Sequence, residues 1–133
     1  MQRSLSVLLP VKNAQATLAA SVHETLDLLA DSIERFELVI VDDGSTDATS
    51  EIAQELTSQY PQVRFLRHGV ALGREAAIRT GLTRSRGEVV VMRDAGGSGF
   101  RILQRPTDLS RSRPSRPGRP NYLSRLRSFM FDE

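Results

Sequence analysis

Apolar runs and amphipathic stretches alternate regularly along the first part of the chain. Runs that are nearly all apolar are typical of strands covered on both faces of a sheet. Four runs predict strands: "SLSVLLPV" (4–11), "FELVIV" (36–41), "VRFLR" (63–67) and "EVVVM" (88–92), of which "FELVIV" is nearly all apolar. Pro10 and Asn13 end the first run and predict a loop after it.

The segments between these runs have helical character. Helices are expected at about 14–32, about 46–59 and within "GREAAIRTGLTRS" (73–85). In the first of them, apolar residues recur every three or four positions and form one stripe that must lie against a sheet. That stripe consists of Leu18, Val22, Leu26, Leu29 and Ile33. Strands that alternate with helices in this way predict right-handed βαβ units and a parallel sheet, an α/β fold.

The last part of the chain has a different composition. Residues 1–95 carry 10 Lys and Arg against 13 Asp and Glu, whereas residues 96–133 carry 8 against 3 and include four of the six prolines. Such a composition buries too little apolar surface to offset chain entropy, so 96 to about 121 is expected to be disordered, with a short helix over "YLSRLRSFMF". We therefore predict a folded domain at 1–97 and a basic tail at 98–133.

Several classes of protein are disfavoured by composition. The 133 residues include no cysteine, which excludes disulfides and thiolate metal sites. No apolar run approaches the roughly 18 residues of a membrane span, and the N-terminus lacks a signal-peptide core. We expect a soluble, cytoplasmic chain.

Polar residues gather where the predicted strands end. They are "PVKN" (10–13), "DDGSTD" (42–47) and "RDAGG" (93–97). Open α/β sheets bind ligands outside the carboxyl ends of their strands, so these three segments are candidate binding loops.

The "DDGSTD" segment has both a structural and a ligand interpretation. Asp-Gly favours a turn, Ser45 or Thr46 could cap the next helix, and Asp47 would favourably meet its positive end. Asp42 and Asp43 are not needed to end a strand, and adjacent carboxylates repel each other. Such a carboxylate could accept hydrogen bonds from a base imide or a ribose hydroxyl. On the residues alone, both interpretations stay open.

Four blocks in order resemble a known family. "SVLLPVKNAQATL", "ELVIVDDGSTDAT", "HGVALGREAAIRTGLTRSRGE" and "VVVMRDAGG" are similar to the N-terminal half of family 2 glycosyltransferases. The third block is most like the polyprenyl-phosphate sugar transferases. The resemblance implies the GT-A fold, a Rossmann-like three-layer arrangement with a mostly parallel sheet and helices on both faces, here truncated after the fourth strand. It also implies binding of a UDP- or GDP-sugar and inverting hexosyl transfer.

The resemblance assigns nucleotide-sugar contacts to particular residues. Val41 and Asp43 take the positions that hold the base, Asp42 supports the turn, and Arg74 lies in the block that approaches the nucleotide. The full predicted set is Pro10, Val11, Lys12, Asn13, Val41, Asp42, Asp43, Arg74, Arg93, Asp94 and Ala95.

The fourth block departs from the family's Asp-any-Asp motif. Asp94 takes the first position, whereas Gly96 stands in place of the second aspartate. The resemblance therefore implies a weak site for Mg²⁺ or Mn²⁺, with Asp94 as the metal ligand and the nucleotide supplying the rest. Arg93 either offsets phosphate charge or is solvated. The family places its catalytic base in the second half of the domain, and no residue here takes that role.

Three functions stay open. A truncated or degenerate glycosyltransferase would use a lipid phosphate or saccharide acceptor, and a non-catalytic module would bind a nucleotide sugar without turnover. A nucleic-acid role for the Arg-rich tail is disfavoured because the tail has few aromatic residues. An exposed edge beyond the fourth strand predicts a homodimer. His23 and His68 are expected at the surface or as caps.

Overall fold

A computed structural model describes residues 3–94 and 99–103. Strands and helices alternate as the hydrophobic pattern predicts. The strands are β1 (Leu5–Val11), β2 (Phe36–Asp43), β3 (Val63–His68), β4 (Val89–Met92) and β5 (Arg101–Leu103). The helices are α1 (Leu18–Ala30), α2 (Thr49–Gln59) and α3 (Arg74–Arg84).

One sheet contains all five strands, in the order β3-β2-β1-β4-β5. β1 pairs in parallel with both β2 and β4, and β2 pairs in parallel with β3. The chain therefore builds outward from β1 to β3, then crosses back to place β4 on the other side of β1. This reversal makes the space beside the end of β1 a topological switch point, where open α/β sheets bind ligands.

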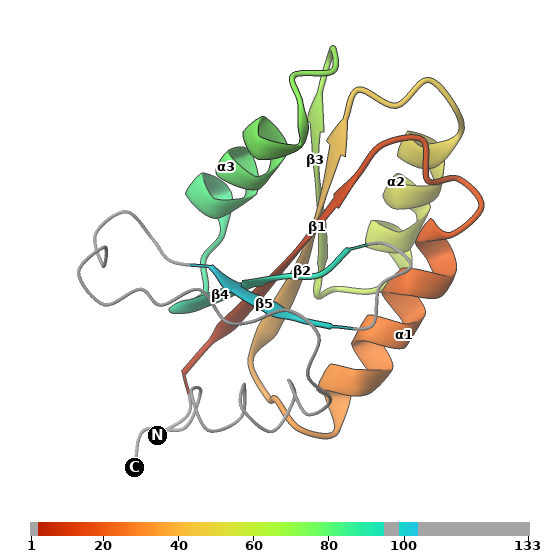
Figure 1. Cartoon of the computed structure of the whole chain (residues 1–133). Coiled ribbons are helices and arrows are strands. Elements are labelled where there is room, and N and C mark those ends of the chain that lie inside the picture. The colour runs from red at the N-terminus through yellow and green to blue at the C-terminus, as the bar shows by residue number, and fades with distance from the viewer. Residues whose placement is uncertain (1–2, 95–98, 104–133) are drawn as a thin grey trace.

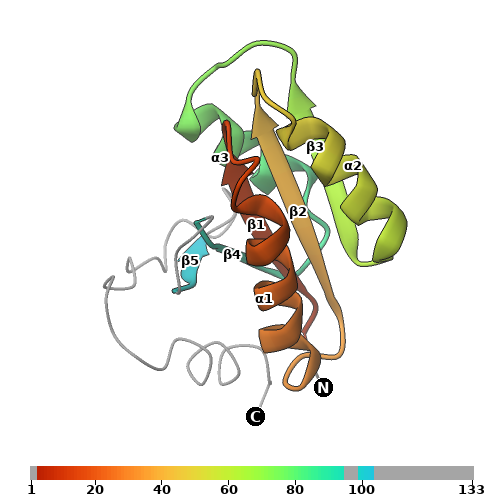
Figure 2. The same cartoon turned by 90° about the vertical axis from the view of Figure 1, so that its right-hand side faces the viewer.

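Helices cover both faces of the sheet, as expected for three layers. α1 and α2 lie on one face and α3 on the other (Figure 1). In the view of Figure 2, α1 lies in front of β1 and α2 lies in front of β3. The side chains of β1 alternate accordingly: Val7, Leu9 and Val11 pack in the core beneath α1 and α2, whereas Leu8 packs with Ala77 of α3. The α/β fold class is confirmed.

A fifth strand corrects the expectation that the sheet ends after the fourth. β5 pairs antiparallel with β4, with Val91 opposite Ile102, and the preceding Phe100 is buried. Disorder was expected from 96 to about 121, and this expectation is wrong at 101–103. Three residues are too few to show a strand period, and pairing with β4 supplies the backbone hydrogen bonds that composition does not reveal.

Other expectations for the last part of the chain are untested. Residues 104–133, with the expected short helix, lie outside the described residues, and the division into two regions at residue 97 stays a prediction. β5 covers the edge of β4 that motivated the expected homodimer, which also stays a prediction. No helix within the described ranges is long and apolar enough to cross a membrane.

A polar cluster joins the sheet to the turn before β4. Glu37 accepts hydrogen bonds from the Ser6 hydroxyl (2.6 Å), the Arg86 N–H (2.6 Å) and the Arg64 guanidinium (2.7 Å). Burial raises the pKa of Glu37, but these hydrogen bonds outweigh burial and lower the pKa overall. The Gly87 N–H donates to the Ser6 hydroxyl at 2.7 Å. The approach is so close that a Cβ on Gly87 would lie 2.5 Å from the Ser6 nitrogen.

We predict that Gly87→Ala destabilises the chain, because the new methyl group would meet rigid backbone rather than a side chain that can move. Overpacking of this kind costs about 1–3 kcal/mol. Urea denaturation measures the loss, and Gly69→Ala is the matched control because a Cβ there meets nothing within 4 Å. Equal stability of the two variants would contradict this account of the turn.

Candidate functional site

The loops after β1 and β2 are joined side by side at the switch point. Asn13 has a left-handed backbone (φ 50°), and its N–H donates to the Ser45 hydroxyl at 2.8 Å. Its side-chain oxygen accepts from the Thr46 N–H at 2.8 Å. Further along, the Ala14 N–H donates to the Thr49 hydroxyl at 2.9 Å. The two loops thus form one continuous surface at the carboxyl edge of the sheet.

Asp42 holds the turn after β2 together from inside. Its carboxylate is fully buried and accepts from the Ser45 N–H (2.9 Å) and the Ser50 hydroxyl. The Ser45 hydroxyl donates to the same carboxylate. These bonds support the turn role predicted for Asp42.

The same contacts explain why α2 begins later than expected. The expectation that Ser45 or Thr46 caps α2 is wrong: the N-cap is Ala48, without a side-chain cap hydrogen bond. Ser45 is bound to Asp42 and Thr46 to Asn13, so neither is free to cap. Asp47 instead accepts from the Thr49 N–H at 2.9 Å, which agrees with its expected place at the positive end of the helix.

Asp43 fixes the loop that leads into α3. One oxygen, Oδ1, accepts from the Leu72 N–H (2.8 Å) and faces His68 Nδ1 (2.9 Å), while Oδ2 accepts from the Gly73 N–H (2.9 Å). Burial raises the pKa of Asp43, but the hydrogen bonds from His68 and the two backbone groups outweigh it and lower the pKa overall. The ionised carboxylate is therefore the form that holds the loop.

Gly44 allows the same loop to approach the turn closely. It has φ +70°, and a Cβ there would lie 2.5 Å from the Ala71 nitrogen. Only glycine combines this backbone conformation with this contact. The turn after β2 and the loop before α3 are therefore in direct backbone contact.

His68 is a residue of the site that the sequence pattern does not predict. It was expected at the surface or as a cap, yet its side chain is only 9% exposed and lies between Asp43 and Thr80. Because a carboxylate only accepts, Nδ1 carries the proton, so in the neutral ring Nε2 accepts from the Thr80 hydroxyl at 2.8 Å. Strand register is the feature that could have indicated this contact, because His68 and Asp43 end neighbouring parallel strands and lie opposite each other.

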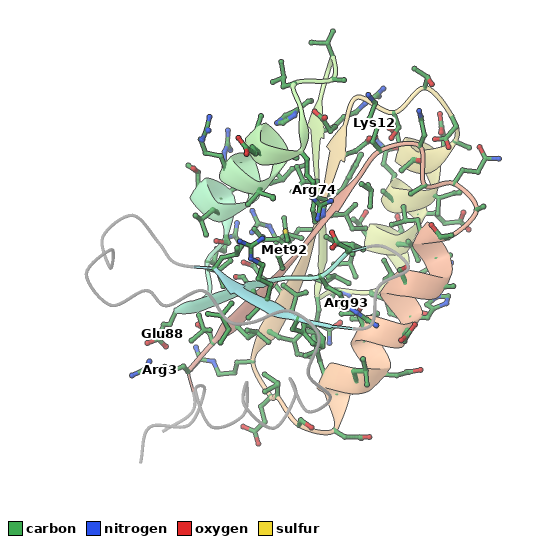
Figure 3. The ribbon with its side chains drawn as sticks, viewed as in Figure 1. Arg3, Lys12, Arg74, Glu88, Met92 and Arg93 are labelled. Carbon is green, nitrogen blue, oxygen red and sulfur yellow. The ribbon has the colours of Figure 1, made fainter. Side chains whose placement is uncertain are left out.

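Arg74 and Asp94, both predicted nucleotide contacts, form an ion pair. Arg74 begins α3 and Asp94 follows β4, and Nη2 of Arg74 donates to Oδ1 of Asp94. The same nitrogen lies 3.9 Å from the Met92 sulfur, and Figure 3 shows Arg74 above Met92. The side chains are 53% and 55% exposed, so the pair faces solvent at the carboxyl edge.

Arg93 lies apart from this pair, beside α1 (Figure 3). The alternative of a solvated side chain is wrong, because Arg93 is only 2% exposed. Its guanidinium donates to Thr25 and to Glu24 (2.8 Å) of α1 and lies 5.3 Å from the centre of the Phe100 ring. Contact with a phosphate would require these bonds to break.

The remaining predicted residues differ in what they offer a ligand. Pro10 and Val11 are buried, and the Val41 side chain packs in the core beneath α3, so their side chains serve packing. Lys12 is exposed at the end of β1. Ala95 lies outside the described residues. The structure thus brings Lys12, Asn13, Asp42, Asp43, Arg74 and Asp94 to one edge of the sheet.

Comparison with known proteins identifies the family. Residues 6–95 match the sequence model of glycosyl transferase family 2, and this range contains every described residue of the site. The chain belongs to this family.

Relatives within the family have named activities. Over 110 residues the chain is 36% identical to "Dolichyl-phosphate beta-glucosyltransferase ALG5A" of Trichomonas vaginalis, covering 76% of this chain and 34% of that protein. It is 35% identical over 103 residues to the human dolichyl-phosphate beta-glucosyltransferase, covering 72% of this chain and 32% of the relative. The chain therefore spans about a third of the length of these relatives.

Solved structures of similar fold have been captured with nucleotide sugars. The mannosyltransferase PcManGT of Pyrobaculum calidifontis, in complex with GDP-Man and Mn²⁺, has a TM-score of 0.58 and 26% identity over 71% of this chain and 28% of its own. TarS of S. aureus, in complex with UDP-GlcNAc, has a TM-score of 0.53 and 26% identity over 69% of this chain and 26% of its own. These likenesses confirm the GT-A type of fold.

The depressed pKa of Asp43 predicts a pH-dependent contribution to stability. A carboxylate whose folded pKa lies below the unfolded value of about 3.9 stabilises the fold above that value, and this contribution is lost as pH falls through the folded pKa. Asp43→Asn should cost about 1–3 kcal/mol at pH 7, because backbone N–H groups lose a charged acceptor.

Urea denaturation across a pH series checks this prediction. The stability difference between the natural chain and Asp43→Asn should shrink as the solution is acidified below about pH 4. Asp27→Asn, at an exposed position on α1, is the control and should leave the unfolding free energy nearly unchanged. A difference that stays constant with pH would contradict the role assigned to the Asp43 carboxylate.

Proposed function

We propose that this chain binds a nucleotide-diphosphate sugar at the carboxyl edge of its sheet and forms the donor-binding part of a glycosyltransferase. The observation that carries the proposal is the series of hydrogen-bonded loops at the switch point, built from residues within the family 2 match. Asn13 links the first two loops, and Asp43 links the second to the start of α3. Arg74 then links α3 to Asp94 after β4.

The hydrogen-bond capacity of Asp43 supports a contact with the nucleobase. A carboxylate has roughly four lone-pair positions. Two on Oδ1 are directed to His68 and Leu72, and one on Oδ2 to Gly73. One position on Oδ2 is left for a donor such as a base imide N–H. Asp43 therefore combines a structural role with a ligand role. Asp42 also accepts three hydrogen bonds, but it is fully buried and so is closed to a ligand.

The relatives suggest the chemistry of donor and acceptor. The named activity of those quoted above is transfer of glucose to dolichyl phosphate, and the structural neighbours hold UDP-GlcNAc or GDP-Man. We propose a UDP- or GDP-hexose as donor and a polyprenyl phosphate as acceptor. Transfer also needs a base for the acceptor and a surface that binds it, to which we assign no residue of this chain.

Few side chains at this site could bind a divalent cation. PcManGT was captured with Mn²⁺, and the equivalent role here would fall to Asp94 together with the diphosphate oxygens. When bound, such an ion would neutralise charge on the leaving diphosphate. Asp94 is the only carboxylate predicted to hold it and is already paired with Arg74, so we propose that any cation binds weakly and depends on the nucleotide.

Calorimetric titration with UDP-glucose and GDP-mannose in the presence of Mn²⁺ tests the proposed function. We expect one of the two to bind, and Asp43→Asn to weaken binding by roughly tenfold to a hundredfold, because a charge-assisted hydrogen bond and the loop geometry are lost together. Asp27→Asn should bind like the natural chain. Absence of binding to both nucleotide sugars, or equal affinity of the two variants, would contradict the proposal.

A second measurement separates transfer from binding alone. The chain is incubated with the nucleotide sugar that binds and with a polyprenyl phosphate, and the released nucleoside diphosphate is measured. Release that depends on the acceptor supports a transferase, whereas binding without release supports a non-catalytic nucleotide-sugar module.

A further inference from the structure

Asp94 has few partners with which to hold a metal ion. Across the described ranges 3–94 and 99–103, no three His, Cys, Asp or Glu side chains gather into a metal site. The residues that follow Asp94 are Ala95, Gly96 and Gly97, none of which carries a side-chain oxygen. Mg²⁺ and Mn²⁺ prefer oxygen ligands, commonly one or two carboxylates with substrate phosphates. Asp94 alone therefore provides the smallest ligand set that such an ion uses, and most of the ligands would have to come from the nucleotide.

The carboxylate that remains already faces a positive charge. Oδ1 of Asp94 is bound to Nη2 of Arg74. A divalent cation at Asp94 would lie beside the guanidinium and be repelled by it, unless the arginine first moved away. Both side chains are about half exposed, so the pair itself is weak and can exchange partners when a ligand arrives.

Arg74 is placed to meet an anion at the carboxyl edge. It is the first residue of α3, directly after the two N–H groups that Asp43 holds, so its backbone is fixed relative to the sheet. Among the described contacts, Nη2 is the only nitrogen of the guanidinium in a hydrogen bond. The remaining donors of this planar fork match the geometry of phosphate oxygens.

We propose that Arg74, rather than a weakly held divalent cation, supplies the main positive charge facing the diphosphate, and that the main role of Asp94 is to orient the guanidinium. This inference rests on the proposed nucleotide-sugar site and specifies which group neutralises the negative charge of the diphosphate bound there. The nucleotide consequently binds without a metal ion. A guanidinium needs one carboxylate partner, whereas a dication needs several oxygens, so the side chains present here fit the arginine better than a metal ion.

Calorimetric titration with UDP and with GDP, each in EDTA and in Mn²⁺, tests this inference. The natural chain should bind its preferred nucleotide with the same affinity in both buffers. Arg74→Gln should bind roughly tenfold or more weakly in EDTA, since it loses a charge-assisted contact. Arg79→Gln, the same charge change at an exposed position of α3, should bind like the natural chain. Asp94→Asn should still bind in EDTA, but more weakly than the natural chain because the guanidinium loses the carboxylate that orients it, and Mn²⁺ should leave that affinity unchanged.

The outcomes separate this inference from the proposed function. Binding that appears only with Mn²⁺ and disappears in Asp94→Asn would show a metal site at Asp94, overturning the inference while the nucleotide site stands. Equal affinities of Arg74→Gln and Arg79→Gln in EDTA would also overturn it. Failure of the natural chain to bind either nucleotide in both buffers would overturn the inference and the proposed function together.

Discussion

The carboxylate of Asp43 is the contact on which the carboxyl edge of the sheet depends. It ends β2, faces His68 at the end of β3, and accepts from the two N–H groups that precede α3. A buried charge is tolerated only when its hydrogen-bonding capacity is nearly filled. The groups that fill it come from the end of β3 and from the loop before α3, so satisfying one charge also fixes the position of Arg74.

The adjacent residues Asp42 and Asp43 have different structural roles, because successive side chains of a strand point to opposite faces of the sheet. Asp42 is directed to the face of α2, where it binds Ser45 and Ser50. Asp43 is directed to the face of α3, where it binds the loop at Leu72 and Gly73. Because the two side chains point to opposite faces of the sheet, their carboxylates are kept apart and repel each other less. Asp42 supports the turn, and Asp43 positions the loop before α3.

Much of this arrangement follows from local pattern. Four strands, three helices and the gathering of polar loops at one edge were predicted from periodicity and the rule for parallel sheets. The remaining features depend on contacts distant in sequence. His68 is buried by Asp43 and Thr80, Arg93 by α1 and Phe100, and β5 exists through pairing with β4. Residues that are usually exposed, or runs of three, carry no local signal for such partners.

We propose the series of hydrogen-bonded loops at the switch point as the nucleotide-sugar site. Amide chemical shifts of the ¹⁵N-labelled chain, followed during titration with UDP-glucose and GDP-mannose, test it at the level of single residues. We expect one of these ligands to shift the amide signals of Asn13, Gly44, Leu72, Gly73 and Arg74, while the amide signals in the middle of α1 stay unchanged. No shifts with either ligand, or shifts confined to residues away from this edge, would contradict it.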